Sequence, residues 1–157
     1  MKPKDIPLGY YTHINYAFAL IDPKTFHVVA MDPDTGRHYD EVTSLKGNQP
    51  GLQVWIAIGG WAMNDPGPYR TAFSDMAKST ANQDAFFESL VMFMTTHGFD
   101  GVDIDWEVRK RQYRHGHSLA WSFQDICSQR PRDSTLWPTI AAVLRPISRT
   151  TYACLRA

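Results

Sequence analysis

The sequence has few cysteines and no long hydrophobic run, and each of these features excludes a class of protein. Its 157 residues include two cysteines, Cys127 and Cys154, too few for a disulfide framework; one disulfide or two free thiols are both compatible with the sequence. No stretch approaches the ~18 consecutive apolar residues of a membrane-spanning helix, so no membrane partner is expected. The first residues, MKPKDIPLGYY, lack the apolar core of a secretion signal, and no export signal is expected in this chain.

An excess of charge of either sign is also lacking, because 16 Lys and Arg residues balance 16 Asp and Glu residues. Nucleic acids attract proteins with a strong basic excess, so we expect no nucleic acid partner. The balance conceals an asymmetry. Residues 1–107 carry 7 basic and 14 acidic residues, whereas residues 108–157 carry 9 basic and 2 acidic residues and no glutamate. The composition therefore divides the chain into two segments of different character.

Three apolar runs predict buried strands, over residues 12–21, 51–61 and 99–106. Turn residues follow the first run, and the sequence DPDTG at 32–36 predicts a second turn. Runs that are apolar on both faces are typical of parallel sheets covered by helices, which makes the chain an α/β protein. After residue 107 the pattern weakens and no further strand is predicted.

Helices are expected between the second and third strands. Apolar side chains recur at helical spacing from Tyr69 to Lys78. A second helix begins at Ser79 or Thr80, either of which can cap it, and ends at His97-Gly98.

The third strand contains an acidic motif, DGVDIDWE, at residues 100–107. Side chains alternate between the two faces of a strand, so the eight residues separate into two sets. One face carries Asp100, Val102, Ile104 and Trp106, and the other carries Gly101, Asp103, Asp105 and Glu107. Three carboxylates on one buried face cannot all stay ionised, because burial and mutual repulsion both raise carboxyl pKa values.

A carboxyl group that keeps its proton near neutral pH can act as a general acid. Glu107 ends the strand, and ligands of α/β folds bind at the carboxyl ends of strands. We therefore expect Glu107 to be the acid, with Asp105 and then Asp103 as the neighbours that raise its proton affinity. A divalent metal site is the main alternative for such a cluster; we expect no metal. Trp106 beside the acids favours a sugar ligand.

The motif DGVDIDWE resembles the Asp-x-x-Asp-x-Asp-x-Glu motif of family 18 glycoside hydrolases, the chitinases and their relatives. WIAIGGW (55–61) is similar to the glycine-rich third strand of that family, and THINYAF (12–18) to its second strand. The segments NDPGP and TAFSDMAKSTANQDAFFESL look most like the fungal chitinases related to the killer-toxin alpha subunit. The resemblance covers about residues 4–107.

The resemblance implies hydrolysis of chitin by a retaining, substrate-assisted mechanism without a cofactor. Glu107 would protonate the glycosidic oxygen, Asp105 would orient the N-acetyl group of the substrate, and Asp103 would share the proton load. Trp61, Gly60 and Trp106 would contact the sugar. Asp100, Gly101 and Gly59 would be structural members of the motifs. Endo-action, an extracellular location and a monomeric full-length enzyme are further expectations from the family.

The family fold is a (β/α)8 barrel, which typically needs ~250 residues. The chain is therefore predicted to form a partial TIM barrel, about strands 2 to 4 with their helices. Residues 1–107 would be this partial catalytic domain. Residues 108–157 would be a non-homologous Arg-rich tail, from a retained intron or a shifted reading frame; a divergent but genuine tail is the alternative. The alternative function is a non-catalytic chitin-binding lectin on the same barrel. A third outcome is a truncated product without activity.

Overall fold

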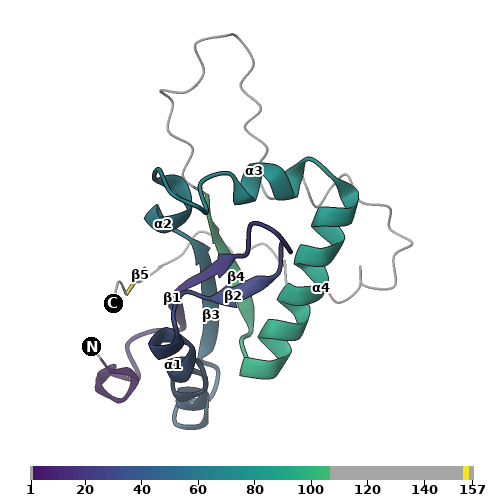
Figure 1. Ribbon diagram of the computed structural model, residues 1–157. Coiled ribbons are helices and arrows are strands. Elements are labelled where there is room, and N and C mark those ends of the chain that lie inside the picture. Colours follow the sequence, from purple (N-terminus) through teal and green to yellow (C-terminus); the bar gives the residue numbers. More distant parts are fainter. Residues whose placement is uncertain (1, 107–153, 156–157) are drawn as a thin grey trace.

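The computed structural model describes residues 2–106 together with Cys154–Leu155 (Figure 1). Glu107 and the predicted tail up to residue 153 lie outside the described residues. The three predicted strands are present as β1 (His13–Ile21), β3 (Gln53–Gly59) and β4 (Gly101–Asp105). They are parallel, with β3 between the other two. The prediction of a parallel α/β sheet is confirmed.

Two further strands pair with β1, and the sequence did not predict either. β2 (Val28–Ala30) runs antiparallel to the carboxyl end of β1, after a tight connection in which Asp22 accepts hydrogen bonds from the following turn. β5 (Cys154–Leu155) pairs in parallel with Asn15 and Tyr16. The prediction of no strand after Glu107 is therefore wrong for these two residues.

The sequence DPDTG at 32–36 starts a helix, so its prediction as a turn is wrong. Asp32 caps α1 (Pro33–Ser44): one of its carboxylate oxygens accepts hydrogen bonds from the main-chain N–H groups of Asp34 and Thr35, at 2.8 Å each. Proline suits the first position of a helix, where no N–H is needed. An Asp-Pro pair therefore fits a turn and a helix start equally well.

Three helices follow β3. The first is the short α2 (Trp61–Asn64), which was not predicted. α3 (Ala72–Ala77) is shorter than expected, because residues 69–71 form turns, in one of which Ala72 N–H donates to the carbonyl of Tyr69. α4 (Thr80–His97) agrees with its prediction, and of the two possible caps it uses Ser79. Gly98 ends it in the left-handed conformation.

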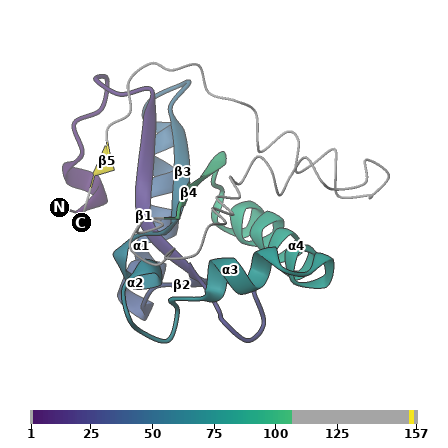
Figure 2. The same cartoon turned by 90° about the horizontal axis from the view of Figure 1, so that it is seen from above.

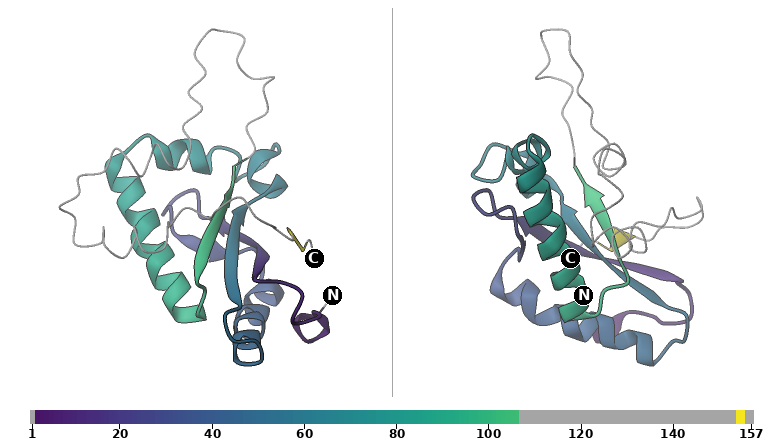
Figure 3. Two further views of the ribbon diagram at one scale, coloured as in Figure 1. Left: turned by 180° about the vertical axis from the view of Figure 1, so that it is seen from behind. Right: turned by 90° about the vertical axis from the view of Figure 1, so that its right-hand side faces the viewer.

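The hydrophobic core lies on one face of the sheet, where α1, α3 and α4 cover it (Figures 2 and 3). β3 and β4 contribute alternate residues to this face: Ile56, Ile58 and Val102 belong to the core, and Ile104 packs against it. Tyr39 of α1 is fully buried there, among the rings of Tyr16, Phe93 and Phe99. No helix among the described residues is long and apolar enough to cross a membrane.

The amino-terminal end of β4 is fixed by Asp100. Its carboxylate accepts hydrogen bonds from the main-chain N–H of Val54 and from Lys46, both at 2.8 Å. Lys46 also donates to the carbonyl of Gly98. These contacts align β4 with β3 at the end of the sheet away from the acids.

Candidate active site

The face of the sheet opposite the core carries the acids. In-register pairing places Asp103 beside Ala57 of β3, and Ala57 beside Ala17 of β1. Asp105 is paired with Gly59 at the carboxyl ends of the two strands. Asp103 and Asp105 therefore follow one another along a face whose nearest strand positions carry only small side chains. Glu107, which the alternation would place next on this face, lies outside the described residues.

The amino half of the same face is filled by Trp55. This residue is paired with Gly101, and a Cβ on Gly101 would collide with the indole ring. The indole is 9% exposed and is contacted by His13, with ring centroids 5.8 Å apart. Gly101 thus allows a large ring to close the amino end of the face. The acids begin directly beyond it.

Asp103 is half-buried and keeps a contact that the sequence did not reveal. The side-chain amide of Asn15 donates a hydrogen bond to Asp103 Oδ2 at 3.1 Å. Burial raises the pKa of Asp103 above its ordinary value, and the negative charge of Asp105 raises it further. The Asn15 hydrogen bond acts in the opposite direction. Asp103 and Asp105 are thus an interacting pair of carboxyl groups, in which the charge of Asp105 raises the pKa of Asp103.

Gly59 and Gly60 allow the end of β3 to approach the end of β4 closely. Gly59 has φ of 122°, and a Cβ there would collide with the main-chain oxygen of Asp105. Gly60 has φ of 68°, and its Cβ would lie 2.8 Å from the ring of Phe18. Gly60 N–H donates to the carbonyl of Asp105 at 3.0 Å. A Cβ at Gly59 would push the ends of β3 and β4 apart, and a Cβ at Gly60 would collide with the Phe18 ring of β1.

The helical turn α2 is held against both neighbouring strands. Asn64 donates from its amide to the carbonyls of Gly60 and Asp105, at 2.6 and 3.4 Å. Met63 is buried, and its sulfur accepts a hydrogen bond from Ile21 N–H at the end of β1. Trp61, which begins this turn, is 57% exposed at the same end of the sheet as Asp105. The sequence did not predict these contacts of Asn64.

Trp106 is not brought together with the acids. Its ring stacks on Phe73 of α3, with centroids 5.3 Å apart and an interplanar angle of 15°, and it packs against the core. This places the indole on the helix-covered side of the sheet, the side that alternation predicted. Among the described residues, Trp61 is the exposed tryptophan at the carboxyl end of the strands.

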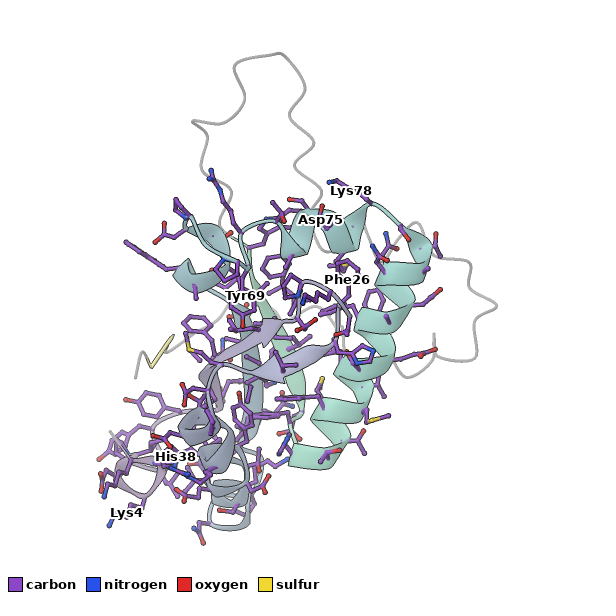
Figure 4. The ribbon with its side chains drawn as sticks, viewed as in Figure 1. Lys4, Phe26, His38, Tyr69, Asp75 and Lys78 are labelled. Carbon is purple, nitrogen blue, oxygen red and sulfur yellow. The ribbon has the colours of Figure 1, made fainter. Side chains whose placement is uncertain are left out.

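A groove elsewhere on the molecule does not coincide with the acids. It lies between the N-terminal 3-10 helix η1 (Pro3–Asp5) and α1, and residues such as Lys4, His38 and Glu41 line it. Figure 4 shows Lys4 and His38 at one end of the molecule, and Asp75 of α3 with Lys78, the residue that follows α3, at the other. The strands end toward α2 and α3, so the groove lies at the amino-terminal end of the sheet. Within the described part of the chain, no group of three or more His, Cys, Asp or Glu residues could hold a metal.

A parallel α/β sheet with interacting carboxyl groups near the carboxyl ends of its strands is compatible with a barrel-type acid–base enzyme. Comparison with known proteins shows the family. The model of the glycosyl hydrolases family 18 matches residues 1–149, and the chain belongs to this family. The matched range continues past Glu107 into the Arg-rich segment.

Relatives match a smaller part of the chain. Mouse chitotriosidase-1 is 34% identical over 105 residues, which are 67% of this chain and 21% of the mouse protein. The group IV chitinase of Ostrinia furnacalis superposes with a TM-score of 0.60 at 28% identity, over 68% of this chain and 28% of that one. The described fold thus matches part of the TIM barrel of chitinase structures. The chain spans about a fifth of the length of the curated relatives it matches.

One similar structure is not described as an active enzyme. Human YKL-39, a pseudo-chitinase with retained chitooligosaccharide binding, superposes with a TM-score of 0.57 at 28% identity, over 68% of this chain and 27% of that one. The fold alone therefore does not separate hydrolysis from binding.

Proposed function

We propose that this chain is the acid-bearing part of a retaining, endo-acting chitinase, which hydrolyses β-1,4-linked N-acetylglucosamine polymers. The observation that carries the proposal is the coupled pair Asp103 and Asp105, half-buried on the face opposite the core. Family membership supports the reaction class. Chitin or chito-oligosaccharides are the substrate, no cofactor takes part, and the enzyme acts outside the cell as a monomer.

In this proposal Glu107 is the acid that protonates the glycosidic oxygen and later activates water. Asp105 orients the N-acetyl group, whose carbonyl oxygen attacks the anomeric carbon, and Asp103 shares a proton with Asp105. The raised pKa of Asp103 supports this sharing, because a carboxyl group with raised proton affinity accepts a proton readily. Trp61 and Gly60 shape the sugar-binding side. Trp106, stacked on Phe73, is left out of the sugar contacts.

We also propose that this chain alone hydrolyses chitin poorly. Within the described residues the strand order ends at β4, so the outer edge of the strand that bears the acids has no neighbour there. An unpaired strand edge promotes aggregation, and a partial barrel leaves its inner face open. We expect low solubility and little release of sugar from the purified chain. Robust turnover by this chain, abolished by Glu107→Gln, would contradict that expectation.

We further propose that residues 108–157 derive from a retained intron or a shifted frame and that residues 1–107 are the partial catalytic domain. The change in charge after Glu107 supports this. The family match up to residue 149 counts against it. Sequencing the transcript across the codons for Glu107 and Val108 decides the matter. A message that continues into further barrel strands supports the proposal, and a message that always encodes the Arg-rich segment contradicts it.

The test of hydrolysis uses the longest protein that the transcript encodes. Glu107→Gln should lower the release of chito-oligosaccharides by about 10²–10⁴-fold, the contribution typical of a positioned general acid. Glu88→Gln, an exposed glutamate on α4, serves as the matched control and should leave release unchanged. If the unmodified protein binds chito-oligosaccharides but releases no sugar, the alternative function, a non-catalytic chitin-binding lectin, is favoured. The likeness to YKL-39 supports this alternative.

A further inference from the structure

Asn15 is a polar residue in the middle of an otherwise apolar strand, and it is 6% exposed. Its main chain belongs to the sheet, where it is paired with Trp55 of β3. A buried side-chain amide costs free energy unless it forms hydrogen bonds. The contact that the structure gives this amide is its donation to Asp103 Oδ2, 88 residues further along the chain. The hydrogen bond to Asp103 thus offsets the free energy that burial of the Asn15 amide costs.

The geometry explains how β1 reaches a side chain of β4 across the intervening strand. Asp103 is level with Ala57 of β3 and Ala17 of β1. Because these side chains are only methyl groups, they leave space above the middle strand, β3. Two residues earlier along each strand, on the same face, stand Asn15, Trp55 and Gly101, and the indole of Trp55 occupies the space over Gly101. The Asn15 amide therefore lies at the boundary between the filled amino half of the face and the acidic half.

We propose that Asn15 is a positioning residue of the site, which holds Asp103 by its Oδ2 atom and leaves Oδ1 for the proton that Asp103 shares with Asp105. A carboxyl group fixed at one oxygen cannot rotate away from its neighbour. The catalytic consequence rests on the proposed function, but the contact itself can be tested without any hydrolysis.

Among the described residues, few charged groups lie near enough to Asp103 to complicate the interpretation of its titration. On β4 the charged neighbour of Asp103 is Asp105. In the described parts of β1 and β3, the positions that face Asp103 carry Asn15, Ala17 and Ala57, none of which titrates. His13 lies at the amino end of the face, against Trp55. Among the described residues, burial, Asp105 and the Asn15 amide therefore govern the titration of Asp103.

The first measurement uses the unmodified 157-residue chain. Nuclear magnetic resonance follows the carboxyl carbon of Asp103 and the side-chain amide of Asn15 as pH is varied. We expect the Asn15 amide resonances to shift with the same midpoint as the Asp103 carboxyl, because ionisation strengthens the hydrogen bond that the amide donates. An Asn15 amide that does not respond to the titration of Asp103 would overturn the inference.

Substitutions give the second measurement. Asn15→Leu removes the donor and keeps the branched shape of the side chain, and Asn15→Ala removes it without adding volume; either should shift the Asp103 midpoint upward. Thr43→Val is the matched control, since Thr43 is also buried and donates to the carbonyl of Tyr39 on α1, away from the acids. It should leave the midpoint of Asp103 unchanged. A folded Asn15 variant with an unshifted midpoint would count against the proposal, and the measurement on the unmodified chain applies even if neither variant folds.

The outcomes separate this inference from the proposed function. If the amide and the carboxyl titrate together while the longest encoded protein releases no sugar, Asn15 positions Asp103 and the proposal of hydrolysis fails. If sugar is released but the two groups titrate independently, hydrolysis stands and the role of Asn15 is wrong. In an active enzyme, Asn15→Leu should shift the acidic limb of the pH profile of kcat more than it changes KM, which loss of packing alone would not do.

Discussion

The two faces of the sheet carry side chains of opposite character, apolar on one face and polar on the other. The covered face presents Ile56, Ile58 and Val102 to three helices, and its stability comes from the burial of apolar area. The other face presents an amide and two carboxyl groups above small residues, with Trp55 closing one end. The comparison indicates that the first face stabilises the fold, whereas the second places polar groups where they cost stability. Removal of a carboxyl charge from the second face should therefore change stability with the opposite sign to removal of an apolar side chain from the first face.

The largest effect is expected at Phe73, which connects the covered face to the site. Its side chain is 1% exposed in the core, and its ring stacks on Trp106, the residue before Glu107. Phe73→Ala should lower the free energy of unfolding by about 3–5 kcal/mol, the cost of deleting a buried ring. Urea unfolding followed by tryptophan fluorescence measures it. Tyr10→Ala, at a residue 83% exposed, should change stability by less than about 0.5 kcal/mol and serves as the control.

The next effect is expected at Gly59, where the strand ends meet. Gly59→Ala combines a strained positive φ with a collision against the Asp105 main chain, and each should cost about 1–3 kcal/mol. Two controls separate these causes. Gly51→Ala has positive φ but open space around it, and Gly101→Ala meets the Trp55 ring without a positive φ. If Gly59→Ala is no more destabilising than Gly51→Ala, the close approach to Asp105 is not what requires glycine.

A smaller effect is expected at the start of α4, the helix that covers β4. Ser79 accepts a hydrogen bond from the main-chain N–H of Asn82, so Ser79→Ala should cost about 1 kcal/mol of stability. Thr80→Ala should cost less than about 0.5 kcal/mol, because Thr80 is exposed and already lies within the helix. Thermal unfolding of both variants tests this. Equal losses would mean that the cap is shared between the two residues.

The covered face was largely predictable from the sequence, because its signals are local. Runs of apolar residues predicted β1, β3 and β4, and helical spacing with a terminal glycine predicted α4. The start of α1 was missed because Asp32-Pro33 fits a turn as well as a helix. β2 was missed because its pairing with β1 depends on a short connection rather than on a long apolar pattern.

The acid-bearing face was predictable only in part. Alternation along a single strand placed Asp103 and Asp105 on one face, and a motif predicted their chemistry. Asn15 and Asn64 were missed because each acts on a strand far away in the sequence, and such contacts depend on strand order and register. A signal for Asn15 was nevertheless present, as the one amide in an apolar strand. Sequence patterns report which face a residue occupies, and the structure reports what it meets there.

The smallest expected effect, at Asp103, has the opposite sign to all the others. Burial and Asp105 raise the pKa of this residue in the folded chain, so the folded state binds its proton more tightly than the unfolded state does. The stability associated with Asp103 is complete below its ordinary pKa of 3.8 and is lost as pH rises through the folded value. Asp103→Asn removes this loss and should stabilise the chain near neutral pH, with the difference from the unmodified chain vanishing in acid.

Urea unfolding between about pH 3 and pH 7 measures this difference, and Asp75→Asn is the matched contrast. The hydrogen bond from Lys78 holds the pKa of Asp75 below its ordinary value, so Asp75 contributes stability above that value and loses it in acid. Asp75→Asn should therefore destabilise the chain near neutral pH, again with no difference in acid. If Asp103→Asn destabilised the chain as Asp75→Asn does, the Asn15 hydrogen bond would outweigh burial and repulsion. The acid-bearing face would then contribute to stability as the covered face does, and the contrast between the two faces would fail.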